Sequence, residues 1–184
     1  TNYAKYNKNS EILVSKGVTT IETSAGYFLS GKDIMFDNKK KIIKSNQSAI
    51  IKDLENNNIY LDNFEYSTVN NFFKSIGDIK VIDLKKNTYN FSQIYIDENK
   101  KEIIGTDSKA FLNDKSFKTK DENDPRIFSN SVKIKDGQIN FTKSVFTLCG
   151  YRDEDKCPPW SIQASEMRHD SKSKTIFYDN AVIK

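Results

Sequence analysis

The chain has 184 residues, a formal net charge of +4 and 36% hydrophobic residues, which is enough for one domain with its own apolar core. Its 7 glycines and 3 prolines exclude collagen-like and proline-rich low-complexity proteins. The positive charge is dispersed and arginine is scarce, which argues against a nucleic-acid partner, because such proteins gather basic residues on one face. No apolar stretch approaches the roughly 18 residues that a membrane-spanning helix needs.

Residues 1–11 precede the repeated part of the chain and are expected to form an N-terminal extension. Because the first residue is Thr1 and not Met, we expect that a leader has been removed or that a longer chain has been cut. No linker or shift in composition divides the rest, so we expect residues 1–184 to form a single domain.

Residues 11–117 repeat themselves with a period of 30 and without gaps. Two of the repeated columns are apolar in every copy: Ile34, Phe64 and Ile94 form one, and Phe36, Tyr66 and Ile96 form the other. Three longer columns are Leu13, Ile43, Phe73 and Ile103; Gly17, Gln47, Gly77 and Asp107; and Ile21, Ile51, Val81 and Phe111. A fixed period of this length is typical of stacked units that share one continuous core.

Within each copy the apolar residues alternate with polar ones, which predicts strands with one buried face. Polar segments at 37–41, 56–58 and 97–101 separate these strands, so each copy is predicted to be strand, turn, strand, turn. No segment has the apolar spacing of an amphipathic helix, and we expect little helix.

After residue 117 the repeat loses its phase at a polar loop, residues 121–126, and then resumes. Alternation at 132–135 and 139–141 around Asp136-Gly137 predicts a tight hairpin. A last unit follows at 167–178, with a turn at 171–174, and the final strand at 181–183 ends directly before Lys184. We count about six units, and the abrupt stop leads us to expect that a larger protein continues beyond residue 184.

Two all-β architectures fit this pattern: an elongated open β-jelly roll of stacked antiparallel strands, and a parallel β-solenoid. Strands of about ten residues favour the antiparallel jelly roll. The inward columns are candidates for lining a groove that takes an acyl chain, and the alternative is that they fill a dry core. The groove candidates are Ile34, Phe36, Phe64, Tyr66, Ile94, Ile96 and Ile134.

The sequence contains no recognisable catalytic or cofactor-binding motif, so we expect a protein that is not an enzyme and holds no cofactor. The single histidine, His169, lies on an inward column and is interpreted as a hydrogen-bonded core residue. Two cysteines and one histidine cannot supply the four ligands of a structural zinc site, so no metal is expected. The acidic residues gather in turns, where solvated loop charge is the ordinary interpretation.

The two cysteines, Cys149 and Cys157, lie close together in a polar loop near the C-terminal end. Their spacing suits a disulfide that closes a hairpin loop if the chain is exported. Two free thiols in a reducing compartment are the alternative.

Near the C-terminus, the segments CPPWSIQA at 157–164, MRHD at 167–170 and KTIFYDNA at 174–181 resemble the LPS-assembly proteins of the LptD family. In that family a Trp-x-Ile-x-Ala segment precedes a His-Asp turn and an Asn-Ala strand that leads to an outer-membrane barrel. The repeats at 12–117 look, more weakly, like the OstA-type modules shared with the periplasmic carriers LptA and LptC.

This resemblance implies an open β-jelly roll at the periplasmic face of the outer membrane of a Gram-negative bacterium, exported with its leader removed. It implies that the domain accepts lipopolysaccharide from the carrier bridge, holds the lipid A acyl chains in its apolar interior and passes them to the barrel. The implied partners are LptA, joined edge to edge, and the lipoprotein LptE, reached through a barrel that would follow residue 184. Cysteines of that family can also pair with barrel cysteines, which leaves the partners of Cys149 and Cys157 open. The alternative function is a structural β-repeat or β-solenoid scaffold, such as an adhesin segment, that binds no lipid.

Overall fold

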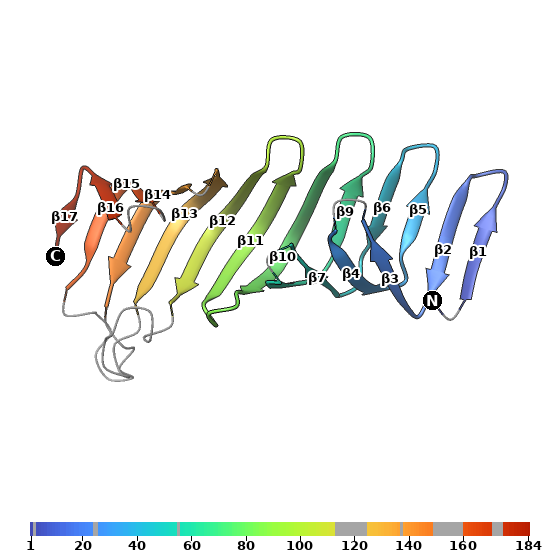
Figure 1. Ribbon diagram of the computed structural model, residues 1–184, viewed down its shortest axis with the longest axis horizontal. Coiled ribbons are helices and arrows are strands. Elements are labelled where there is room, and N and C mark those ends of the chain that lie inside the picture. The colour runs from blue at the N-terminus through green and yellow to red at the C-terminus, as the bar shows by residue number, and fades with distance from the viewer. Residues whose placement is uncertain are drawn as a thin grey trace.

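The computed structural model describes residues 1, 3–23, 26–54, 56–112, 125–136, 138–148, 160–170 and 175–184, without the side chain of Asp170. These residues form seventeen strands in one continuous sheet, and no helix is found among them. The strands stand side by side along the long axis of the molecule, with the N-terminus at one end and the C-terminus at the other (Figure 1). None of the described segments is a helix that could cross a membrane.

In the N-terminal half, each long strand is broken in its middle, so that the chain forms pairs of short strands. Since the expected alternation of apolar and polar residues continues on either side of each break, the sheet bends there without losing its buried face. These strands are β1 (Tyr3–Asn7), β2 (Ile12–Lys16), β3 (Val18–Glu22), β4 (Phe28–Lys32), β5 (Met35–Asp37), β6 (Ile42–Ser45), β7 (Ala49–Lys52), β8 (Asn58–Leu61) and β9 (Phe64–Ser67).

In the C-terminal half, most strands run through the bend without a break. The first of them, β10, pairs with β9 through one end and with β8 through the other, and so joins the two halves of the sheet. These strands are β10 (Phe72–Ile82), β11 (Thr88–Asp97), β12 (Glu102–Phe111), β13 (Arg126–Lys135), β14 (Gln138–Thr147), β15 (Ile162–Asp170), β16 (Thr175–Asp179) and β17 (Val182–Ile183).

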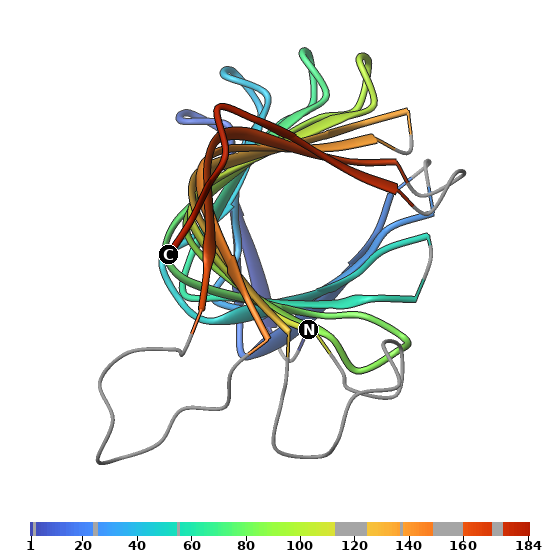
Figure 2. The same ribbon diagram turned by 90° about the vertical axis from the view of Figure 1, so that its left-hand side faces the viewer.

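The bend divides the sheet into two arms that curl around a common interior (Figure 2). The upper arm holds β1, β2, β5, β6 and β9 and the parts of β10–β15 in line with them, ending at β16. The lower arm holds β3, β4, β7 and β8 and the remaining parts of β10–β15, ending at β17. Every pairing is antiparallel. The expected open antiparallel jelly roll is therefore confirmed, and the parallel β-solenoid is wrong.

The turns at the tips of both arms explain the period of 30. In each upper turn that the structure describes, one residue has a positive φ. Four of these residues recur at intervals of 30: Glu11, Lys41, Asn71 and Lys101, with φ of 57°, 57°, 50° and 50°. Such a conformation reverses the chain sharply and is tolerated by Asn better than by most residues. In the lower turns Asp53 and Asp83 each accept hydrogen bonds from the backbone N–H four residues later, at 2.9 Å in both cases. Each 30-residue repeat thus contains one upper turn and one lower turn.

Strand register places one inward residue of every upper-arm strand in a single line, the upper row. The repeated columns that begin at Leu13 and at Phe36 fall together in this row, as the spacing predicts. The members of the upper row are Tyr6, Leu13, Phe36, Ile43, Tyr66, Phe73, Ile96, Ile103, Ile134, Ile139, His169 and Ile176.

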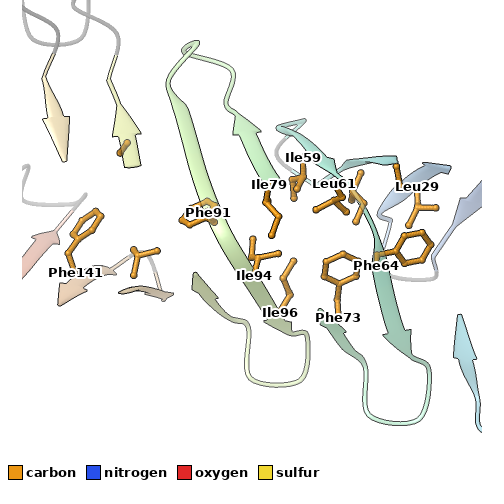
Figure 3. Close-up of a cluster of buried hydrophobic side chains, with 14 of the residues drawn as sticks. Leu29, Ile59, Leu61, Phe64, Phe73, Ile79, Phe91, Ile94, Ile96 and Phe141 are labelled. Atoms are coloured by element: carbon orange, nitrogen blue, oxygen red, sulfur yellow. The ribbon is translucent and has the colours of Figure 1, made fainter. Parts of the chain in front are cut away.

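A matching lower row crosses the other arm. Its members are Ile21, Leu29, Ile51, Ile59, Val81, Tyr89, Ala110, Ile127, Phe146, Ile162 and Ile183. The side chains of the two arms meet in one core, in which Phe64 and Phe73 stack with ring centroids 6.1 Å apart (Figure 3).

One member of the expected columns is misplaced. Phe111 does not join Ile51 and Val81 in the lower row, where Ala110 stands instead. The inward residues of β10 next to the bend are Ser75 and Ile79, four apart, because β10 carries a bulge there. β12 crosses the bend without this extra residue, so every later position changes face. Phe111 consequently pairs with the outward residues of β11 and β13, and the guanidinium carbon of Arg126 lies 5.6 Å from its ring centroid.

A candidate apolar cleft between the arms

The interior of the N-terminal half contains a narrow cleft between the two arms. Its free volume is about 50 Å³, and most of its surface is apolar. Polar atoms enter its lining mainly from residues near the tips of the arms, where the cleft opens. The lining residues are Ile21, Thr23, Tyr27, Leu29, Ile43, Ile51, Phe64, Tyr66, Phe73, Ile96 and Glu98.

The upper wall of the cleft is a stretch of the upper row. Ile43 pairs with Tyr66, Tyr66 pairs with Phe73, and Phe73 pairs with Ile96, so four neighbouring strands each place one side chain in this wall. Directly opposed residues on one face of a sheet lie close enough for their side chains to pack. The wall is therefore continuous across these four strands.

The lower wall is built in the same way from the lower row. Ile21 pairs with Leu29, and Leu29 pairs with Ile51, which places three aliphatic side chains on neighbouring strands. Leu29 and Ile51 are 8% and 5% exposed, so this wall belongs to the buried core and to the cleft at once. Packed aliphatic walls of this kind favour a hydrocarbon occupant over a polar one.

A polar lip lies where the cleft opens, formed by Tyr27 on the lower arm and by Tyr66 and Glu98 on the upper arm. The Tyr66 hydroxyl donates a hydrogen bond to the Glu98 carboxylate at 3.1 Å and lies 3.3 Å from the side-chain oxygen of Asn71. Burial, reinforced by the charge of Glu98 and by Tyr27, raises the pKa of Tyr66 to about 12. The Tyr66 hydroxyl consequently stays protonated at neutral pH and serves as a donor.

The structure places the seven predicted groove residues on the inner face, but it brings only some of them to the cleft. Phe64, Tyr66 and Ile96 line it. Ile34 and Ile94 are 4% and 3% exposed and lie beside the bend as core residues. The other two, Phe36 and Ile134, are half-buried members of the upper row outside the cleft lining. Whether these seven residues contact lipid stays a prediction.

Eight lining residues were not among the predicted groove residues. Four of them were recognised only as members of repeated columns, and the other four were missed altogether: Ile21, Ile43, Ile51 and Phe73 belong to the first group, and Thr23, Tyr27, Leu29 and Glu98 to the second. The alternation of Tyr27, Leu29 and Gly31 was a usable signal for an inward strand face. Glu98 lies in a turn, and its place at the lip depends on the curl of the sheet, which no spacing reports.

The interior of the C-terminal half is filled by packed side chains. Val132 pairs with Phe141 and Phe141 pairs with Met167, and these three residues are 3%, 6% and 1% exposed. A Cβ atom added at Gly105 would lie only 2.5 Å from the ring of Phe91, so this ring occupies the space that a side chain at position 105 would need. Half-buried His169 lies farther along the upper row, between Ile139 and Ile176.

Other candidate sites are weaker. A shallow hollow of about 690 Å³ lies open on the outer face of the lower arm, where Lys80 and Asp78 border the exposed side chains of Ile50 and Tyr60. No group of three or more His, Cys, Asp or Glu suited to a metal ion is present in the described part of the chain. The predicted disulfide between Cys149 and Cys157 lies outside the described residues.

Comparisons with known proteins give distant likenesses among solved structures alone. No family model matches the chain, and no curated protein matches it. Among solved structures, the chain is similar to LptH from Pseudomonas aeruginosa, described as the LptA homologous periplasmic component of the conserved lipopolysaccharide transport device. The sequence identity is 7%, the TM-score is 0.48, and the alignment covers 66% of this chain and 80% of LptH.

Proposed function

We propose that this chain is a periplasmic module for lipopolysaccharide transport, which holds lipid A acyl chains between its two arms. The observation that carries the proposal is the apolar cleft whose walls belong to rows that continue across neighbouring strands. The choice of lipopolysaccharide among lipids rests on the resemblance of residues 157–181 to LPS-assembly proteins.

The energetics of acyl chains agree with a carrier that is open along one side. Each buried methylene contributes roughly 0.8 kcal/mol, so a fully enclosed lipid would leave very slowly. A cleft that shares the chains with the next module holds them less tightly and permits transfer. The proposal includes no covalent chemistry.

Photocrosslinking in living cells tests the proposal directly. A photoreactive amino acid at Phe36, Tyr66 or Ile96 should capture lipopolysaccharide, because these side chains face the interior. Matched controls are the preceding residues, Met35, Glu65 and Tyr95, which face the other side of the same strands. Equal capture at inward and outward positions would reject lipid binding between the arms.

A structural scaffold without lipid binding is the second candidate function. The small free volume of the cleft, about 50 Å³, and the filled C-terminal interior favour it. In that case neither set of photoreactive positions captures lipopolysaccharide, while the protein remains folded and stable.

A more specific part of the proposal concerns the partners of the module and its location in the cell. We propose that the module works at the periplasmic face of the outer membrane, receives lipid from an LptA-like carrier joined edge to edge, and delivers it to a barrel with its lipoprotein LptE. The strands β1 and β3 at one end and β16 and β17 at the other each have a single partner strand among the described residues, which supports pairing at the ends. Purification with a tagged LptA or LptE from the same cells tests this assignment.

A further inference from the structure

The cleft is too small for the ligand that its walls suit. Its free volume of about 50 Å³ has room for only a few water-sized groups. An acyl chain of a dozen carbons needs several times that space. If the cleft takes such a chain, its walls must move apart, because packed interiors do not yield by small adjustments at many places.

The same half of the molecule has a line along which the walls can separate. Four consecutive long strands are interrupted at the bend: between β2 and β3, β4 and β5, β6 and β7, and β8 and β9. β11, β12, β13 and β14 cross the bend without interruption. Apart from the break between β16 and β17 at the C-terminal end, the interrupted strands therefore lie in the half of the molecule that holds the cleft.

At the bend, side-chain hydrogen bonds add to the backbone hydrogen bonds that remain between neighbouring strands, such as the one from the Ser15 N–H to the Ile34 carbonyl at 2.8 Å. The backbone N–H of Gly17 donates to the Asp33 carboxylate at 3.3 Å, and the backbone N–H of Asp78 donates to the Asp62 carboxylate at 3.2 Å. Gly17 and Gly77 have φ of 79° and 129°, values that side-chain-bearing residues seldom adopt. Such positions can change their backbone angles without breaking the ladders on either arm.

We infer that the N-terminal half is a hinged clamp, in which the two arms part at the bend and the lip of Tyr27, Tyr66 and Glu98 closes over a hydrocarbon chain. The inference rests on the proposed lipid binding and adds to it a conformational step. Tyr27 and Tyr66 reach the lip from opposite arms, whereas the Tyr66–Glu98 hydrogen bond joins residues of the same arm and can persist during opening.

The test joins the two arms covalently at the lip, so that the cleft can no longer open. Facing sheets lie about 10 Å apart, beyond the Cα distance that a disulfide spans. We therefore join Tyr27→Cys and Tyr66→Cys with a reducible bis-methanethiosulfonate linker, in a background with Cys149→Ser and Cys157→Ser. The probe is dodecanoic acid carrying a fluorescent group at its carboxyl end. The control pair, Lys44→Cys and Glu65→Cys, joins directly opposed residues on the outer face of the upper arm.

We expect linked Tyr27→Cys/Tyr66→Cys protein to bind the probe at least about tenfold more weakly than unlinked protein, with binding restored by reductant and the control pair unaffected. Full binding by the linked protein overturns the clamp and leaves the proposed lipid binding intact. If the unlinked background protein binds no probe, the proposed function fails, and the clamp fails with it.

A second measurement leaves the lip untouched. Spin labels at Lys44→Cys and Lys52→Cys report the separation of the arms, because β6 and β7 lie on opposite sides of the bend. The clamp predicts that this separation increases by several ångströms when dodecanoic acid is added. An unchanged distance at saturating probe contradicts it.

Discussion

At the scale of single residues, the bend depends on small side chains that the 30-residue period repeats. Ser15, Ser45 and Ser75 are 6%, 3% and 1% exposed, and each hydroxyl donates to a backbone carbonyl of the neighbouring long strand. Gly105 occupies the fourth position of this series. These hydrogen bonds join neighbouring strands where the ladder is interrupted, so the serines stabilise the bend.

Two buried serines allow a matched test of this role. Ser75→Ala should lower the free energy of unfolding by about 1 kcal/mol, because it removes the 2.7 Å hydrogen bond from the buried Ser75 hydroxyl to the carbonyl of Asn63. Ser129→Ala should be neutral or stabilising, because the Ser129 hydroxyl has no hydrogen-bond partner among the described residues. Urea unfolding of both variants measures the difference. Equal losses would show that the serines act only through packing.

At the scale of strands, much was predictable from the sequence and one thing was not. Period-two alternation and polar turns locate the strands, and the period of 30 places Phe36, Tyr66 and Ile96 on one face. Such patterns do not reveal the number of residues that a strand uses to cross the bend. This number changes between β10 and β12, and a change of one residue exchanges the faces of a strand, as it does at Phe111.

The lower wall of the cleft was incompletely predicted for the same reason. Leu29 and Ile51 are neighbours in the lower row but lie 22 residues apart in the chain, a separation set by turn lengths and by the bend. No regular spacing links them to Tyr66 on the opposite wall, since that contact arises from the curl of the sheet. Prediction therefore worked along each arm and failed between the arms.

The packing of β11 on β12 gives a further prediction. Gly105→Ala should destabilise the protein by about 1–3 kcal/mol, because the new methyl group would collide with the ring of Phe91, which is 9% exposed. Phe91→Leu in the same chain should recover part of this loss by vacating the space. A double-mutant cycle from thermal unfolding measures the coupling, and strict additivity of the two changes contradicts the proposed collision.

At the scale of the whole molecule, the described sheet ends in strands that each pair with a single strand, β1 and β3 at one end and β16 and β17 at the other. The last strand, β17, exposes Ile183 to 74%, and this residue is the final member of the lower row. Its neighbour Val182 is 53% exposed. An apolar residue at an unprotected sheet edge promotes pairing with another edge, as the proposed end-to-end contact requires.

A charge at this edge should weaken that contact selectively. Ile183→Lys should reduce end-to-end association about tenfold or more, measured by sedimentation at several concentrations or by capture on an LptA-like partner, while the melting temperature stays nearly unchanged. Leu84→Lys is the matched control, because Leu84 is 68% exposed in a lower turn away from either end. The edge contact is disproved if both variants associate like the parent protein.

The register rows have a consequence for movement along the molecule. Neighbouring strands are about 4.8 Å apart, so the twelve positions of the upper row extend over roughly 50 Å. Because one repeat comprises two long strands, a hydrocarbon chain displaced by about 10 Å meets the same pattern of side chains again. If lipid binds as proposed, the free energy of such a chain is nearly periodic over the N-terminal half, with minima of similar depth, and the filled interior of the C-terminal half ends this pattern. Over that stretch, the direction of diffusion would be decided by what supplies the chain at one end and removes it at the other.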